Sequence, residues 1–195
     1  MEDTKPDWRR TLLAARAAIP DADRRAGSSA IADRVRALEW FVEARTILGY
    51  VPLGAEVDCR EVLDTADELL TTVLVPVAGC RPDASRWMPW RGDDEPTGTA
   101  VSLEELAGPI LVLVPGVGFD HSGMRLGRGG GFYDRALADL RRAAPIRAIG
   151  LAFERQIVPK LPSDVWDQRV DAVVSEHRLW TGGPDVRDDV VVRSS

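Results

Sequence analysis

The segment PILVLVPGVGFDHSGMRLGRGGGFYDRALADLRRA (109–143) contains an apolar run, a glycine-rich stretch and a helix-forming stretch, in that order. The run 110–114 is continuously apolar, which is typical of a strand buried on both faces of a sheet. Residues 132–143 are predicted to form a helix. Because ligands of parallel sheets bind beyond the carboxyl ends of the strands, the loop between these two elements is the first place to look for a site.

Apolar strands and helices alternate along the rest of the chain. We expect helices at 7–18, 21–39 and 59–70, and strands at 45–53, 71–77, 146–153 and 171–176, the last paired with 177–180. A short strand near 86–90 and a helical turn within 102–107 are weaker predictions. This alternation predicts an α/β fold with a mostly parallel sheet and helices on both faces.

The composition excludes several classes of protein. The chain has 195 residues and a net charge of −6, and a nucleic-acid binder usually shows a basic balance instead. No apolar run approaches the roughly 20 residues of a membrane span, and the N-terminus lacks the apolar core of a signal peptide. We therefore expect a cytoplasmic protein that binds neither membranes nor nucleic acid, with one domain over 1–180 and a flexible tail over 181–195.

Thiol and histidine chemistry is also sparse. Cys59 and Cys80 are the only two cysteines, and they form no CxxC motif, so a disulfide scaffold or a zinc site is not indicated. Both thiols are expected to be ordinary buried or half-buried residues. The two histidines, His121 and His177, are not accompanied by the GxSxG motif of serine hydrolases.

The glycine-rich loop has the residue types of a phosphate site. Gly127, Gly129, Gly130 and Gly131 would let backbone N–H groups converge on an anion, and the following helix would add its free N–H groups. Two arginines, Arg125 and Arg128, add charge with a fork geometry that suits phosphate. The spacing matches neither a Walker A loop nor the dinucleotide fingerprint GxGxxG. A flexible glycine turn with two surface arginines is the alternative.

Two further charged residues have a functional and a structural interpretation. Asp134 lies in the first turn of the predicted helix, where a carboxylate either complements the helix dipole or holds magnesium beside a polyphosphate. Lys5 is one of only two lysines among 25 basic residues. A lysine kept against such an arginine bias suggests a need for a compact charge, with chance as the alternative.

With these residues in place, a family resemblance is evident. The segment 115–135 resembles, without a gap, the signature of the 5-formyltetrahydrofolate cyclo-ligases, also called 5,10-methenyltetrahydrofolate synthetases. Three further segments agree in order and spacing: KPDWR (5–9), YVPLGAEVD (50–58) and the block 151–176. Residues 78–100 are the weakest part of the resemblance. Gly130 and Phe132 stand where relatives carry lysine or tyrosine.

The resemblance implies a fold, a reaction and two substrates. The fold would be that of sugar-phosphate isomerases and CoA transferases, a three-layer α/β sandwich. The reaction would be ATP-driven closure of 5-formyltetrahydrofolate to 5,10-methenyltetrahydrofolate, with magnesium as cofactor and ADP and phosphate as further products. We expect the protein to act as a monomer on these small molecules.

The resemblance also implies roles for individual residues. Arg128 and Tyr133 would be catalytic, and Tyr133 would orient the formyl oxygen. Asp134 and Asp167 would hold the metal. The residues expected to bind ATP are Lys5, Arg9, Arg125, Leu126, Gly127, Arg128, Gly129, Gly130, Gly131, Phe132 and Tyr133. Those expected to bind the folate are Val51, Glu56, Phe132 and Tyr133.

Several structural alternatives accompany these roles. Tyr133 is otherwise a helix-face residue packed on the core, and Glu56 a loop carboxylate in water. Trp87, Trp90 and Trp166 are candidates to stack on the folate, although most tryptophans belong to the core.

Two other functions are open on the sequence alone. One is a relative that binds nucleotide without turnover, in a regulatory or binding role. The other is an isomerase or transferase of the same fold, which would need an acid/base pair or a glutamate nucleophile.

Overall fold

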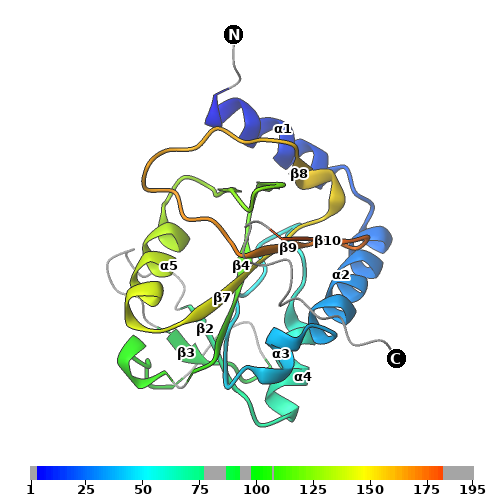
Figure 1. Cartoon of the computed structure of the whole chain (residues 1–195). Coiled ribbons are helices and arrows are strands. Elements are labelled where there is room, and N and C mark those ends of the chain that lie inside the picture. Colours follow the sequence, from blue (N-terminus) through cyan, green and yellow to red (C-terminus); the bar gives the residue numbers. More distant parts are fainter. Residues whose placement is uncertain (1–3, 77–86, 93–97, 107, 182–195) are drawn as a thin grey trace.

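The computed structural model describes residues 4–76, 87–92, 98–106 and 108–181, which form a central sheet flanked by helices (Figure 1). The sheet has seven strands in the order β10-β9-β7-β4-β1-β2-β3. Pairing is parallel from β9 to β2, and only the edge strands β10 and β3 are antiparallel. The predicted mostly parallel α/β architecture is therefore confirmed.

The elements follow the predicted order. The strands of the large sheet are β1 (Thr46–Leu48), β2 (Thr72–Pro76), β3 (Trp87–Pro89), β4 (Ile110–Pro115), β7 (Ile146–Leu151), β9 (Ala172–Val174) and β10 (Leu179–Thr181). The helices are α1 (Lys5–Ala17), α2 (Asp21–Arg36), α3 (Glu39–Glu43), α4 (Arg60–Glu68) and α5 (Phe132–Ala143), with short 3₁₀ turns at Leu103–Glu105 and Glu154–Gln156.

The two faces of the sheet are covered by different helices, as Figure 1 shows. Along β4, Leu111 and Leu113 belong to the core shared with α2 and α4. Ile110, Val112 and Val114 alternate with them and belong to the core shared with α5. Successive side chains of a strand point to opposite faces, so a strand covered on both sides must be apolar throughout. This explains the continuous apolar run that marks β4 in the sequence.

A capping box and a proline stabilise the first turn of helix α1. The Thr4 hydroxyl accepts a hydrogen bond from the N–H of Asp7, and the Asp7 carboxylate accepts one from the N–H of Thr4, which forms a capping box. Pro6 occupies the first turn, where its missing N–H is not needed. The helix buries Leu12 against a third apolar cluster and lies over the end of the large sheet (Figure 1).

A second, small sheet lies under α1, and the sequence prediction missed it. It has the order β6-β5-β8, with β5 at Gly118–Asp120, β6 at Arg125–Leu126 and β8 at Ile157–Val158. The loop expected after β4 therefore contains a hairpin. Strands of two or three residues are too short to show an alternating pattern, so only tertiary packing reveals them. Gly118 permits this packing, because a Cβ there would lie 2.4 Å from Leu12 Cδ1.

Other boundaries differ more modestly. The second helix ends at Arg36 rather than residue 39, because Leu38 is extended, and the short helix α3 follows it. Thr181, placed in the flexible tail by the sequence, belongs to β10. The remaining tail residues, 182–195, and Cys80 lie outside the described residues, as does most of 78–100.

Through its side chain, Asp120 connects the β5–β6 turn to the chain that follows β8. Its side chain is buried, and Oδ1 accepts hydrogen bonds from Ser122 N (2.8 Å), Ser122 Oγ (2.6 Å) and Met124 N (3.0 Å). The other oxygen, Oδ2, accepts one from Leu161 N at 3.0 Å. The carboxylate thus closes the β5–β6 turn and fixes the chain that follows β8.

We predict that Asp120→Ala lowers the free energy of unfolding by about 3 kcal/mol, because several buried N–H groups lose their acceptor. Urea unfolding followed by circular dichroism measures the change. Ser122→Ala is the matched control and should cost only about 1 kcal/mol, since it removes one hydroxyl from the same turn. Equal stability of Asp120→Ala and the unmodified protein would contradict this role.

Candidate active site

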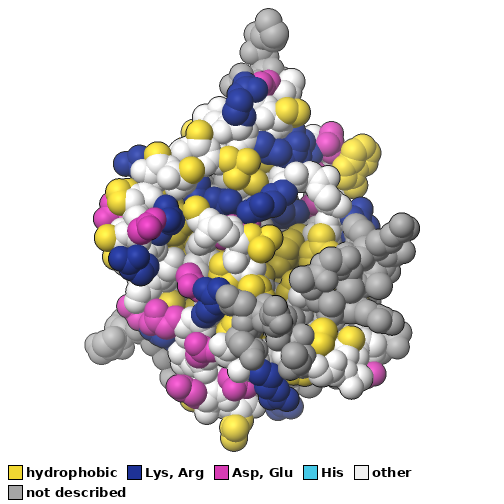
Figure 2. Space-filling model, turned by 180° about the vertical axis from the view of Figure 1, so that it is seen from behind, with side chains coloured by type: hydrophobic (Ala, Val, Ile, Leu, Met, Phe, Trp, Pro, Cys, Tyr) yellow, Lys and Arg dark blue, Asp and Glu magenta, His cyan; other side chains and the backbone are white. Residues whose placement is uncertain are grey.

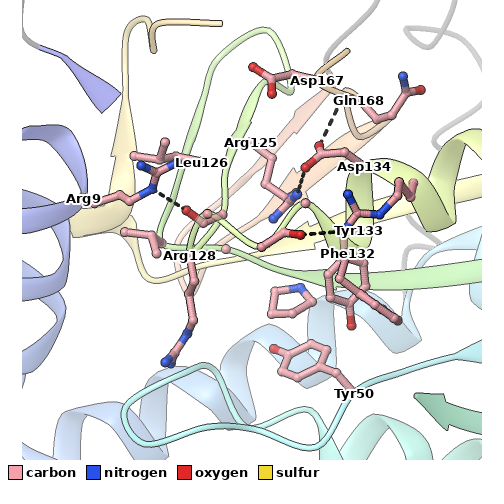
Figure 3. Close-up of a pocket in the computed structure, with 18 of the residues that line it drawn as sticks. Arg9, Tyr50, Arg125, Leu126, Arg128, Phe132, Tyr133, Asp134, Asp167 and Gln168 are labelled. Atoms are coloured by element: carbon pink, nitrogen blue, oxygen red, sulfur yellow. Dashed lines mark hydrogen bonds and ion pairs between the residues drawn. The ribbon is translucent and has the colours of Figure 1, made fainter. Parts of the chain in front are cut away.

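A pocket of about 910 Å³ opens beyond the carboxyl ends of β1, β2 and β4 (Figure 3). Helix α1, the loop after β1, the loop 115–131 and the start of α5 surround it. On the face seen in Figure 2, Lys and Arg side chains form a band below α1, next to hydrophobic side chains. The site thus lies where the parallel sheet predicts it.

The structure brings all of the predicted site residues to this one pocket. They are Lys5, Arg9, Val51, Glu56, Arg125, Leu126, Gly127, Arg128, Gly129, Gly130, Gly131, Phe132, Tyr133, Asp134 and Asp167. Their individual roles remain predictions, but their assembly from four distant segments does not depend on those roles.

The glycine loop leaves the start of α5 open to an anion. Gly131 is the residue before the helix, and it has the left-handed φ of 65° that glycine adopts without strain. No side chain caps the helix among the described residues, so its first N–H groups are free for a ligand. Gly129 is also left-handed, with φ 106°. Arg9 Nε donates to Gly127 O at 2.8 Å and ties the loop to α1.

Arg125 and Asp134 form a partly buried ion pair beside the loop. Arg125 Nη2 donates to Asp134 Oδ2 at 2.8 Å, and the two side chains are 5% and 18% exposed. Asp134 Oδ1 accepts a hydrogen bond from Gln168 N at 3.2 Å, as Figure 3 shows. The Arg125 Nε atom is buried and has no partner among the described residues. Asp134 therefore does more than complement the helix dipole, because it holds the Arg125 side chain and the backbone at Gln168.

Lys5 connects the first helix to the same block. Its ammonium group lies 2.7 Å from Asp164 Oδ2 and 2.5 Å from Asp167 Oδ2. Partial burial lowers the pKa of Lys5, but the hydrogen bonds and charges of the two aspartates outweigh it and raise the pKa overall. Lys5 thus stays charged at neutral pH and pairs with two aspartates of the C-terminal part of the chain.

Glu56 is not the water-exposed carboxylate that the sequence left open. Its side chain is only 8% exposed, and Oε2 accepts a hydrogen bond from Leu53 N at 3.0 Å. The other oxygen, Oε1, accepts from Arg128 Nη2 at 3.0 Å and lies 3.9 Å from Arg16 Nη1. Arg128, expected at the phosphates, thus reaches from the glycine loop toward the loop that carries Glu56, away from Asp134 and Asp167 (Figure 3).

Aromatic residues form the opposite end of the pocket. The Phe132 ring packs edge-on against Tyr133, with centroids 5.1 Å apart, and Tyr50 lies nearby (Figure 3). The Tyr133 hydroxyl is buried and has no hydrogen-bond partner among the described residues. Burial raises the pKa of Tyr133 well above its usual value, so the hydroxyl remains a proton donor. An unpartnered buried hydroxyl is uncommon in proteins and is consistent with a ligand contact.

The structure separates the candidate tryptophans. Trp87 and Trp90 are 0% and 1% exposed and do not line the pocket, so they are core residues. Trp87 supports the site indirectly, because its ring lies 6.3 Å from that of Phe132. Trp166 is 67% exposed and lines the pocket beside Asp167.

Two carboxylates of the pocket, Asp134 and Asp167, are the metal ligands that the sequence predicts. Among the residues that the structure describes, no group of three or more His, Cys, Asp or Glu side chains could hold an ion. Magnesium, however, usually takes one or two carboxylates and completes its shell with water and phosphate oxygens. Asp134 and Asp167 both line the pocket, and one oxygen of each already pairs with a cation, Arg125 or Lys5.

Sequence reasoning missed Arg16, whose buried guanidinium contacts the site from α1. Lys5, Arg9 and Arg16 are spaced by four and seven residues, which places them on one face of the helix. That spacing in the sequence could have identified Arg16 as a further residue of the site.

The described helices include none that is long and apolar enough to cross a membrane.

The fold and the pocket together define an α/β protein in which a cationic glycine loop and an aromatic cluster line one pocket. The family model described as "5-formyltetrahydrofolate cyclo-ligase family" matches residues 1–176. The chain therefore belongs to the 5-formyltetrahydrofolate cyclo-ligase family.

Relatives of known name agree with this membership. A 5-formyltetrahydrofolate cyclo-ligase of Mycolicibacterium smegmatis is 32% identical over 90% of this chain and 95% of the relative. The Escherichia coli K12 protein of that name is 29% identical over 85% and 96%. The NMR structure of Aquifex aeolicus 5,10-methenyltetrahydrofolate synthetase superposes with a TM-score of 0.74 at 25% identity, covering 97% of this chain and 96% of that one.

Cys59 has no place in the chemistry of the site. The thiol is buried, donates to Tyr50 O at 3.1 Å, and does not line the pocket. Burial raises the pKa of Cys59 to about 12, so the thiol is protonated across the neutral range.

We predict that Cys59 is not alkylated by iodoacetamide at about pH 8 in the folded protein, because the thiolate is the reactive form. Peptide mapping by mass spectrometry measures the modification, and the same treatment in guanidinium chloride is the control that should label Cys59 fully. Rapid labelling of Cys59 in the folded chain would contradict the inert role.

Proposed function

We propose that this protein converts 5-formyltetrahydrofolate to 5,10-methenyltetrahydrofolate, with ATP consumed as co-substrate, magnesium as cofactor, and ADP and phosphate released. One observation carries the proposal: a single pocket joins a cationic loop at an open helix N-terminus to an aromatic end that holds a buried carboxylate. A phosphoryl donor and a heterocyclic acceptor need such neighbouring half-sites.

The reaction needs no protein nucleophile. The formyl oxygen attacks the γ-phosphorus of ATP, so an O–P bond forms and ADP leaves. N10 of the folate then attacks the activated formyl carbon and forms the new C–N bond. The C–O bond breaks, phosphate leaves, N10 loses its proton, and the methenyl cation remains. What the protein must supply is alignment and neutralisation of phosphate charge.

At the cationic end, the glycine loop and α5 would hold the phosphates. Backbone N–H groups of Gly129, Gly130 and Gly131 would bind oxygens, with Lys5, Arg9 and Arg125 as nearby charges. Arg128 is 52% exposed and lies between two glycines, so its side chain can leave Glu56 and reach the transferred group. Magnesium, held by Asp134 and Asp167 with the phosphates, would neutralise developing negative charge when bound.

At the aromatic end, Glu56 would accept hydrogen bonds from the amino or ring nitrogens of the folate. Val51 and Phe132 would contact its rings, and the Tyr133 hydroxyl would donate to the formyl oxygen. The unpartnered state of that hydroxyl and the burial of Glu56 support these roles.

The direct test is an absorbance assay for the methenyl product. We predict that the product forms only when 5-formyltetrahydrofolate, ATP and magnesium are all present, because phosphorylation must precede ring closure. Omission of each component in turn is the control. If ATP raises the melting temperature but no product forms at high enzyme concentration, the protein binds nucleotide without turnover and the proposal is wrong.

We predict that Arg128→Ala lowers kcat/KM for ATP by about 100-fold, as removal of a charge that stabilises the transition state does in other enzymes. The affinity for 5-formyltetrahydrofolate should change much less. Arg142→Ala, on the exposed side of α5, is the matched control and should keep full activity. Steady-state kinetics with each substrate varied separates the two effects, and unchanged turnover in Arg128→Ala would remove this residue from the phosphate site.

A further inference from the structure

A buried arginine lies directly behind the folate end of the pocket. Arg16 is in the last turn of α1, and its side chain is only 5% exposed. Burial lowers the pKa of Arg16, and the charge of Glu56 opposes that effect. An arginine is nevertheless always charged at neutral pH, so the chain bears the cost of burying this charge. Such a residue requires an explanation beyond helix formation.

The contacts of Arg16 lead to the pocket. Its Nη1 atom donates to Gly116 O at 3.2 Å, in the turn between β4 and β5. The same atom lies 3.9 Å from Glu56 Oε1. Gly116 O also accepts from Gln156 Nε2 at 3.2 Å, so the turn does not depend on Arg16 alone. Gly116 O thus has a second donor, whereas among the described residues Arg16 is the buried cation that lies beside Glu56.

Glu56 lies beside two arginines, one exposed and one buried. Arg128 is 52% exposed and belongs to the glycine loop, whereas Arg16 belongs to a helix and is enclosed. If Arg128 turns to the phosphates, as the proposed function requires, Arg16 becomes the remaining cation beside Glu56. A buried carboxylate without a cation beside it is costly, so the Arg16 charge stabilises Glu56 in that arrangement.

We propose that Arg16 is a positioning residue for the reaction: it keeps Glu56 as an oriented carboxylate that can accept hydrogen bonds from the N–H groups of the folate. Arg16 itself touches no substrate. This inference rests on the proposed function, in which Glu56 binds the folate. It assigns to the last turn of α1 a part in folate recognition, whereas Lys5 and Arg9, nearer the start of the same helix, would serve the ATP side.

The test is a double-mutant cycle on Arg16 and Glu56, read by direct binding of each substrate and by steady-state kinetics. We expect Arg16→Met to weaken 5-formyltetrahydrofolate binding by about tenfold, with ATP affinity changed less than about twofold. In a Glu56→Gln background, Arg16→Met should add less than about twofold, because its target is already neutral. Arg10→Met is the matched control on the exposed side of α1 and should behave as the unmodified protein.

A second variant covers a folding defect in Arg16→Met. Arg16→Lys retains a cation beside Glu56, so folate affinity should stay within about threefold of the unmodified protein. Circular dichroism and the melting temperature confirm that each variant is folded.

Three outcomes overturn the inference. One is an equal loss in both Glu56 backgrounds, one is an equal loss of ATP affinity, and one is a folded Arg16→Lys that loses folate binding. If the unmodified protein binds no 5-formyltetrahydrofolate, the proposed function fails and the inference with it. If the unmodified protein binds it and the two changes are simply additive, the inference alone fails.

Discussion

Ion pairs connect the residues that line the pocket, and two of these pairs join segments that are far apart in the sequence. Lys5 of α1 pairs with Asp167, Arg125 pairs with Asp134 at the start of α5, and Arg128 pairs with Glu56 of the loop after β1. A pocket that binds polyphosphate needs several cations close together, and these would repel one another without carboxylates between them. The same carboxylates therefore assemble the site and limit its charge.

This arrangement also explains why the two half-sites lie in one pocket. Arg128 extends from the glycine loop to Glu56, and Arg16 approaches Glu56 from behind. The residues expected to bind ATP and those expected to bind folate are thus connected by charge before any ligand is considered. Because Glu56 interacts with one exposed and one buried arginine, movement of Arg128 would alter the surroundings of Glu56 and leave Arg16 in place.

Much of the fold could be predicted because it depends on local patterns. The apolar run of β4 and the helix from Phe132 to Ala143 appear in the structure within one residue of their predicted bounds. The small sheet could not be predicted, because β5, β6 and β8 are two or three residues long and their pairing depends on contacts with α1. The burial of Trp87 and Trp90 likewise depends on packing, and no local signal distinguishes them from Trp166.

The sequence by itself determined the class of fold, the family resemblance and many of the pocket residues, because these follow from hydrophobic periodicity and from motifs that match the family. Only the tertiary structure decided how those residues pair: that Asp134 holds Arg125, that Asp167 holds Lys5, and that Glu56 is buried between Arg128 and Arg16. The reason is physical. The strength of an interaction between two charges depends on the distance between them and on how far water is excluded. Both are fixed only when the chain has folded.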